Sequence, residues 1–252
     1  MAMNNCLSII TLNVNGLNAP SRRHRIAEWK RNHDPHMCCL QEAHLRTKDL
    51  HRLKVKGWKQ IFQANGQGKK ARVAILTSDK IDFKKRAIKR DPEGHIIILK
   101  VRIHQEDINI VNIYTPNTEA PKYIKKILED FKKDIDSNTI TIRDFNAPLS
   151  KMDRSSKQYI KQVIAVLNNV LDQKDLTDIY RAFHPEEAKY TFFSNAHGTF
   201  STIDHMIEHK TSLNKFKKIE IISSIFSDHK GLKLETNLKE KNSKTLKLME
   251  IE

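Results

Sequence analysis

The chain has 252 residues, and its 45 Lys and Arg against 30 Asp and Glu give a net charge of +15. Hydrophobic residues make up 38% and are spread along the sequence, which excludes a disordered or low-complexity protein. No apolar run approaches the ~20 residues that cross a bilayer, and the first residues lack the features of a secretory signal. Three cysteines, an odd number, suit buried thiols better than disulfides. We therefore expect a nuclear or cytoplasmic globular protein that is not associated with membranes.

Two segments concentrate the positive charge. Residues 21–31 hold five basic residues and one acid, and residues 84–90 hold five basic residues and no acid. Basic residues bind polyanions because neutralising a phosphate releases condensed counterions. The charge favours a nucleic-acid partner, with a generally basic, solvated surface as the alternative.

The hydrophobic pattern predicts one α/β domain over residues 1–238, followed by a polar tail over 239–252. Three- and four-residue apolar spacing predicts helices, and short apolar runs bounded by turn residues predict strands. The expected helices are 21–32, 120–136 and 155–172. The expected strands are 7–13, 37–42, 59–63, 73–77, 96–103, 108–114, 139–142, 190–193, 202–207, 219–225 and 231–237. Two packed mixed β-sheets flanked by helices, a four-layer α/β sandwich, would bury this pattern.

Polar side chains recur where these strands end. Each alone is typical of a turn, because Asn and Asp cap turns and tolerate left-handed backbone. Together they provide ligands for a hard cation, a group to activate water and donors to a phosphate, which indicates metal-assisted phosphodiester hydrolysis. His205 is as well explained by a structural role, and Cys38 and Cys39 by the core. The set comprises Asn13, Asn15, Glu42, Tyr114, Asp144, Asn146, Asp204, Asp228 and His229.

The order of these motifs resembles the endonuclease/exonuclease/phosphatase superfamily. Within it, the chain resembles the apurinic-type endonuclease domain of mammalian long interspersed nuclear element (LINE) retrotransposons. The motifs are Leu12-Asn13-Val14-Asn15-Gly16, Asp144-Phe145-Asn146 and Ser227-Asp228-His229, and the resemblance extends over residues 7–238 and includes Ile179-Tyr180-Arg181. In such retrotransposon proteins a reverse transcriptase follows this domain, so a chain that stops at Glu252 is expected to be a truncated relic.

The resemblance implies a role for each motif residue. Glu42 would bind Mg²⁺, with Mn²⁺ as a substitute, and the rest of the metal site would comprise Asn15, Asp144, Asn146 and Asp228. Asp144 would deprotonate the attacking water, and Asp204 would hold the imidazole of His229. Tyr114 and His229 would contact the scissile phosphate, and Asn13 would order the metal shell. The positions that match DNA contacts of the family are Arg154, Thr191, Ser201, Thr202 and Ile203.

Four positions depart from the family pattern. Arg143 and Arg72 replace glycines, Thr202 replaces a basic residue, and Lys230 replaces a small one. A glycine before a catalytic Asp usually permits a backbone angle or a close approach that a Cβ obstructs. An Arg there also brings a cation that can pair with Asp144. We therefore expect weakened nuclease activity, which Arg143→Gly would partly restore.

Three functions remain open from the sequence. The first is an Mg²⁺-dependent endonuclease that nicks one strand of double-stranded DNA for target-primed reverse transcription, acting as a monomer through backbone and minor-groove contacts. The second is an inactive domain that binds DNA or RNA. The third, a phosphatase for a small phosphate ester or lipid head group, is disfavoured by the +15 charge.

Overall fold

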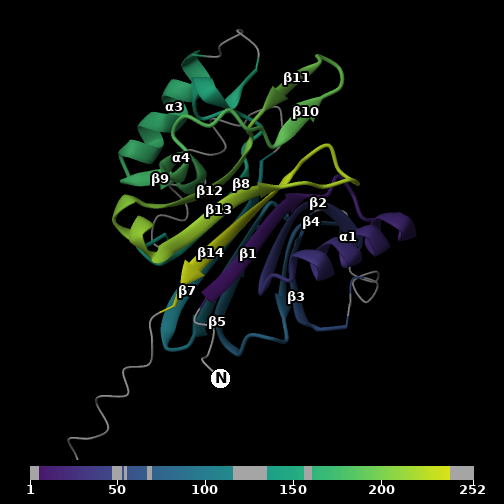
Figure 1. Cartoon of the computed structure of the whole chain (residues 1–252). Coiled ribbons are helices and arrows are strands. Elements are labelled where there is room, and N and C mark those ends of the chain that lie inside the picture. The colour runs from purple at the N-terminus through teal and green to yellow at the C-terminus, as the bar shows by residue number, and fades with distance from the viewer. Residues whose placement is uncertain are drawn as a thin grey trace, which may run out of the picture.

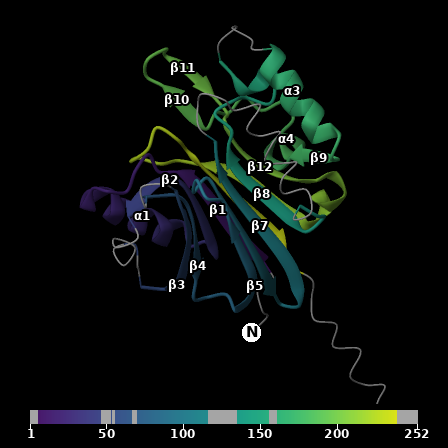
Figure 2. The ribbon, with the colours of Figure 1, turned by 180° about the vertical axis from the view of Figure 1, so that it is seen from behind.

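The computed structural model contains two six-stranded β-sheets packed face to face, with helices on their outer faces (Figures 1 and 2). This confirms the predicted α/β sandwich of two mixed sheets. The residues that the structure describes are 6–46, 53, 56–66, 70–115, 135–155 and 161–238. The predicted helix over 120–136 and the predicted tail over 239–252 lie outside them, apart from residues 135 and 136. No described helix is long and apolar enough to cross a membrane.

The first sheet has the strand order β13-β14-β1-β2-β4-β3, and only β1 and β2 pair in parallel. Its strands are β1 (Cys6–Asn13), β2 (Met37–Arg46), β3 (Trp58–Asn65), β4 (Lys70–Ser78), β13 (Phe216–Ile222) and β14 (Gly231–Asn237). The second sheet has the order β5-β6-β7-β8-β12-β9, and only β7 and β8 pair in parallel. Its strands are β5 (Phe83–Arg90), β6 (Ile96–Ile103), β7 (Glu106–Tyr114), β8 (Thr139–Asp144), β9 (Leu176–Asp178) and β12 (Asp204–His209).

The central strands are apolar on both faces because both faces are covered. Ile9 of β1 and Ile110 of β7 belong to the cluster between the sheets. Ile10 and Leu12, which alternate with Ile9, pack instead beneath a helix. This arrangement explains why these strands appear in the sequence as continuous apolar runs.

Helices cover the outer face of each sheet. α1 (Pro20–His33) packs on the first sheet through Ile26 and Trp29. α3 (Lys161–Asp172) packs on the second through Leu167 and Leu171. The short α4 (Ile179–Phe183) follows β9, and two 3₁₀ helices cover Lys151–Asp153 and Lys210–Lys215. The described layers are thus helix, sheet, sheet, helix.

The structure differs from the sequence prediction at a few elements. The basic segment 84–90 lies in strand β5 at the edge of the second sheet, where exposed cations are tolerated. The strand predicted over 219–225 ends at Ile222, because the indole of Trp29 donates to the carbonyl of Ser223 and draws the chain away. The segment predicted over 190–193 becomes the hairpin of β10 (Phe192–Ser194) and β11 (Thr199–Ser201), which projects beyond the sheets (Figure 1).

Candidate active site

The two parallel strand pairs bring their polar residues to one end of the sandwich. β1 ends at Asn13, and Glu42 lies inside β2, directly after the last residue of β2 that pairs with β1. β7 and β8 end at Tyr114 and Asp144, which are register partners. β12 runs antiparallel to β8, so its first residue, Asp204, also pairs with Asp144. Residues far apart in sequence therefore meet at the same end of the sandwich.

Asp144, Asp204 and His229 form the buried centre of this end. Their ligand atoms all lie within 4.8 Å of one another. Nδ1 of His229, from the loop before β14, lies 2.9 Å from Oδ2 of Asp204. Nδ2 of Asn13 donates to Oδ2 of Asp144 at 2.8 Å. The cluster thus joins residues of both sheets.

Burial and mutual charge set the protonation of this cluster. Burial and then the charge of Asp204 raise the pKa of Asp144 to about 7, against the opposing effects of His229 and Asn13. Burial alone would lower the pKa of His229, but the charge and hydrogen bond of Asp204 raise it to about 9. Near neutral pH the site therefore holds a carboxylate able to accept a proton beside an imidazolium.

Two matching turns shape the strand ends. The side chain of Asn13 accepts the amide N–H of Asn15 at 2.9 Å, and that of Asp144 accepts the amide N–H of Asn146 at 2.9 Å. Asn15, Glu42 and Asn146 have left-handed backbone, with φ of 44°, 49° and 51°. Such conformations occur often at functional sites, where the surrounding structure holds them in place.

A second, more open group lies at the border of the buried cluster. The hydroxyl of Tyr114 donates to Oε1 of Glu42, and burial followed by this bond raises the pKa of Tyr114 well above its usual range. Nδ2 of Asn15 donates to Oδ1 of the exposed Asp228 at 3.4 Å. Within the described residues, Oε2 of Glu42 accepts no hydrogen bond. Carboxylate and amide oxygens of this kind suit Mg²⁺, which is typically bound through one or two carboxylates and keeps several waters.

A buried amide pair beneath the site was not predicted. Nε2 of Gln41 donates to Oδ1 of Asn112 at 2.6 Å, and Nδ2 of Asn112 donates to the carbonyls of Leu40 and Ala74 at 3.1 and 3.0 Å. These bonds tie β7 of the second sheet to β2 and β4 of the first. In the sequence, Gln41 and Asn112 are polar residues inside apolar runs. Gln41 comes one residue before Glu42, and Asn112 comes two residues before Tyr114.

The residues expected to contact DNA lie around the projecting hairpin. Arg154 forms a β-bridge with Ser201, and both are half-buried. Thr191, Thr202 and Ile203 are buried. The hydroxyl of Thr202 donates to the carbonyl of Lys189 at 2.9 Å. Of the five, Arg154 and Ser201 are therefore the more accessible.

Arg143 differs from expectation in two ways. Its backbone is ordinary strand, so the position does not need the conformational freedom of glycine. Because neighbouring strand residues face opposite ways, its side chain lies on the outer face of the sheet, with the guanidinium 4.3 Å from the ring of Phe145. None of its guanidinium nitrogens has a hydrogen-bond partner in the described structure, so the expected pair with Asp144 does not form.

The other departures from the family pattern lie close to the site. Nη1 of Arg72 lies 2.5 Å from Nε2 of His95, whose carbonyl accepts the amide of Tyr114 at 2.9 Å. Lys230 is exposed directly after His229. Arg72 is thus linked through His95 to Tyr114, and Lys230 is adjacent to His229.

Comparison with known proteins finds one relative in sequence. A protein of the transposon TX1 from Xenopus laevis, an uncharacterized 149 kDa protein, is 26% identical over 239 residues, which are 92% of this chain and 18% of that protein. The chain therefore spans about a fifth of that relative's length.

Solved structures share the fold at low sequence identity. The AP endonuclease LMAP from Leishmania major has a TM-score of 0.77 at 14% identity, covering 95% of this chain and 90% of that one. The endonuclease domain of TRAS1, a telomere-specific non-LTR retrotransposon, has a TM-score of 0.71 at 15% identity, covering 93% and 100%. An AP endonuclease from Archaeoglobus fulgidus has a TM-score of 0.69 at 21% identity, covering 90% and 98%.

These matches confirm the resemblance to retrotransposon endonucleases. The model of the Endonuclease/Exonuclease/phosphatase family matches residues 10–229, which include every motif residue of the site. The chain belongs to the Endonuclease/Exonuclease/phosphatase family.

Proposed function

We propose that this protein is a divalent-metal-dependent endonuclease that nicks one strand of DNA, with Mg²⁺ as the metal and Mn²⁺ as a substitute. The observation that carries the proposal is the buried group of Asp144, Asp204 and His229, within hydrogen-bond reach of Asn13. A carboxylate with a pKa near 7 beside a cationic imidazole suits attack of water on a phosphodiester.

Each residue of the cluster has a role in this reaction. Asp144 accepts a proton from the water whose oxygen attacks phosphorus, and the hydrogen bond from Asn13 orients its carboxylate. The P–O3′ bond breaks as the new P–O bond forms, and the 3′ oxygen leaves and takes up a proton from solvent. His229, held by Asp204, donates to a phosphate oxygen as negative charge develops on it. Tyr114 keeps its proton because its pKa is raised, so its hydroxyl remains a donor at the edge of the cluster.

Glu42 leads the set of residues that would hold the metal. Asn15, Asn146 and Asp228 would complete the set; Asn15 donates to Asp228, and Glu42 has one oxygen bonded to Tyr114. A bound Mg²⁺ would polarise a phosphate oxygen and offset its charge. Asn15 and Asn146 follow the ends of β1 and β8 with left-handed backbone, and Glu42 has left-handed backbone inside β2, where the pairing register with β4 shifts.

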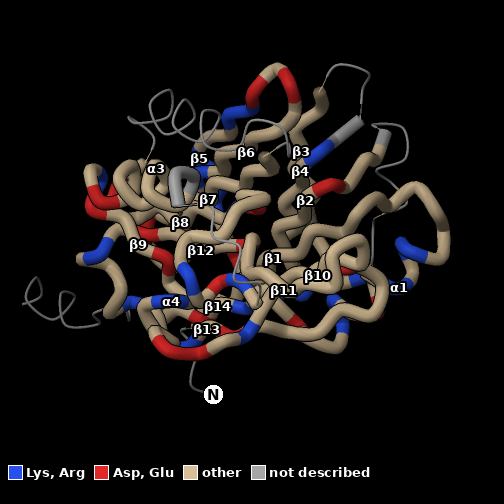
Figure 3. The backbone as a smooth tube through the Cα atoms, turned by 90° about the horizontal axis from the view of Figure 1, so that it is seen from above, with Lys and Arg blue, Asp and Glu red and all other residues tan. Residues whose placement is uncertain are grey.

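The surface around the site suits a polyanion. Figure 3 looks down on this end of the sandwich and shows Lys and Arg positions on α1 and around the strand ends. Ser201 is the last residue of the hairpin and bridges to Arg154, and the hairpin lies beside the site because Phe192 bridges to His229. We assign this face to the DNA backbone and minor groove. Target-primed reverse transcription would then use the 3′ end that nicking exposes.

A nicking assay tests the proposal. Supercoiled plasmid is incubated with Mg²⁺ or with EDTA, using the unmodified protein, Asp144→Asn and the control Asp172→Asn. Asp172 is an exposed carboxylate at the end of α3, paired with Lys210 at 3.2 Å. We expect Mg²⁺-dependent nicking that Asp144→Asn abolishes and Asp172→Asn retains. Nicking that survives Asp144→Asn would contradict the assignment.

A second function, a catalytically inactive nucleic-acid binder, is supported by the net charge of +15. Salt-sensitive binding of a polyanion requires this charge and does not require the buried cluster. Salt-sensitive binding of DNA or RNA without nicking in Mg²⁺ or Mn²⁺ would support that function. Release of phosphate from inositol phosphates, without nicking, would support a phosphatase.

A further inference from the structure

Thr191 lies between the two segments that supply Asp204 and His229. It precedes β10, is 0% exposed, and makes hydrogen bonds with both segments. Its backbone N–H donates to the carbonyl of Ser201 at 3.1 Å, and its carbonyl accepts the N–H of Lys230 at 2.6 Å. Lys230 is the residue after His229, so this bond fixes the chain at the histidine.

The hydroxyl of Thr191 contacts the second segment, which carries Asp204. Its oxygen accepts the amide N–H of Ile203 at 3.2 Å and that of Asp204 at 3.3 Å. The carbonyl of Ile203 in turn accepts the N–H of Phe145, the residue after Asp144, at 2.8 Å. The buried side chain of Thr191 therefore contacts the backbone amide of Asp204. The adjacent residue Ile203 bonds to Phe145, directly after the end of β8.

We propose that Thr191 is a positioning residue that sets the separation of Asp204 and His229. The two come from different sheets, on β12 and before β14, and Thr191 bonds to the backbone at or next to both. The consequence for catalysis rests on the proposed endonuclease activity, whereas the structural role does not. The assignment gives Thr191 no direct contact with DNA, because it is fully buried and its oxygen already accepts two amides.

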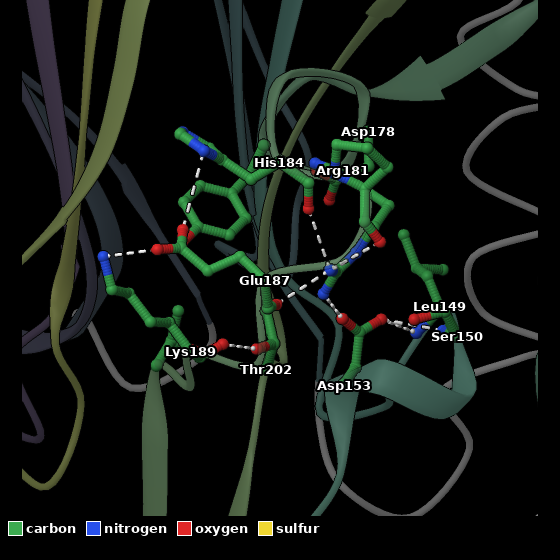
Figure 4. A network of polar contacts seen from close by, with 12 residues as sticks. Leu149, Ser150, Asp153, Asp178, Arg181, His184, Glu187, Lys189 and Thr202 are labelled. Atoms are coloured by element: carbon green, nitrogen blue, oxygen red, sulfur yellow. Dashed lines mark hydrogen bonds and ion pairs between the residues drawn. The ribbon is translucent and has the colours of Figure 1, made fainter.

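A polar network anchors the segment that carries Thr191 (Figure 4). Arg181 donates through Nη1 to the carbonyls of His184 and Glu187 at 3.1 and 3.0 Å, and through Nη2 to Oδ1 of Asp153 at 2.5 Å. The carboxylate of Asp153 also accepts the amides of Leu149 and Ser150, at 3.1 and 2.7 Å.

The network reaches the strand of Asp204 through Thr202. Its amide donates to the carbonyl of Asp153 at 2.8 Å, and its hydroxyl donates to the carbonyl of Lys189 at 2.9 Å. Lys189 lies two residues before Thr191, so Thr202 fixes both the segment that carries Thr191 and the segment that carries Asp204. A fixed support of this kind lets a single hydroxyl define a position.

The test compares Thr191→Val, which keeps the shape and removes the hydroxyl, with Thr191→Ser, which keeps the hydroxyl. Thr236→Val is the matched control, because Thr236 is buried and its hydroxyl donates to the carbonyl of Lys215 at 3.0 Å, at the opposite end of β14. Two measurements are made on each protein: steady-state nicking with kcat and KM separated, and amide hydrogen exchange at Ile203 and Asp204.

We expect Thr191→Val to lower kcat by about tenfold to a hundredfold with little change in KM, as displacement of a catalytic group by ~1 Å does. Exchange at Ile203 and Asp204 should accelerate in Thr191→Val and stay slow in Thr191→Ser and Thr236→Val. A higher KM with kcat retained would instead show a DNA contact and overturn the proposal.

Amide exchange separates this proposal from the proposed nuclease activity. If the unmodified protein does not nick DNA, unchanged exchange in Thr191→Val still overturns the positioning role, and selective acceleration still supports it. If Thr191→Val does not fold, Thr191→Ser decides the question, because faster exchange with the hydroxyl retained would contradict the proposal.

Discussion

Replacing Arg143 with Met is expected to stabilise the folded protein. The Arg143 side chain is 1% exposed, and its three guanidinium nitrogens have no hydrogen-bond partner in the described structure. Burial lowers the pKa of this guanidinium to about 9. The charged group has therefore lost its water without gaining protein acceptors, and the ring of Phe145 is its one described electrostatic contact.

The size of the effect follows from two opposing contributions. Burying an ion costs several kcal/mol in real proteins, and a desolvated cation on an aromatic face recovers about 2 kcal/mol. Met keeps the apolar stem without the charge, so we expect a gain of about 1–4 kcal/mol, as seen when buried ions are replaced by apolar side chains. Arg143→Gly should gain less, because it leaves a cavity beside Phe145 and a glycine inside β8.

Urea unfolding of Arg143→Met measures this gain as a higher midpoint at an unchanged m-value. Arg102→Met is the control, because Arg102 is an exposed arginine of β6 paired with Asp107 at 2.6 Å, and its loss should leave the unfolding midpoint almost unchanged. Nicking per folded molecule should not change, since Arg143 faces away from Asp144. An Arg143→Met protein no more stable than the original would refute the reasoning.

Three further predictions concern charge. Nicking should follow a bell-shaped pH profile, rising through about pH 7 as Asp144 loses its proton and falling near pH 9 as His229 loses its own, and a flat profile would contradict these roles. Burial lowers the pKa of Lys30 to about 8, so between about pH 8 and 10.5 the Lys30 contribution to stability should rise by about 3 kcal/mol, while the buried thiols of Cys38 and Cys39, whose pKa values are raised, contribute in the opposite direction. The difference in unfolding free energy between the unmodified protein and Lys30→Met, measured in urea across that range, isolates the Lys30 contribution and should grow by that amount. DNA affinity measured by anisotropy should fall on the order of a hundredfold between 50 and 200 mM salt, and a flat titration would remove nucleic acid as the partner.

The sequence predicted which polar residues stand at strand ends better than it predicted the edges of the fold. Asn13, Tyr114 and Asp144 each end an apolar run, and that local pattern was enough to place them at strand ends. β5 was missed because five cations in eight residues hide its pairing, which depends on its neighbour β6. Propensity cannot reveal an edge strand whose stability comes from the sheet.

Other features depend on contacts between distant segments. The Gln41–Asn112 bond needs the register of both sheets, which no local pattern contains. The burial of Thr191 likewise depends on how Ser201 and Lys230 fold back on it. The orientation of Arg143 was available from strand alternation: if Asp144 points toward the other sheet, its neighbour points outward. The error at Arg143 was to reason from chain adjacency rather than from the geometry of a strand.

The residue types at the two strand ends serve as turn formers and as site residues at once. Oδ1 of Asn13 accepts the amide of Asn15, which leaves Nδ2 to donate to Oδ2 of Asp144, while Oδ1 of Asp144 accepts the amide of Asn146. Three hydrogen bonds thus link two turns on two sheets and fix which way the Asn13 amide faces. An Asp at position 13 would form the same turn, but it would set a second carboxylate 2.8 Å from Asp144. The turn accepts either residue, so the requirement for Asn comes from the neighbouring carboxylate of Asp144.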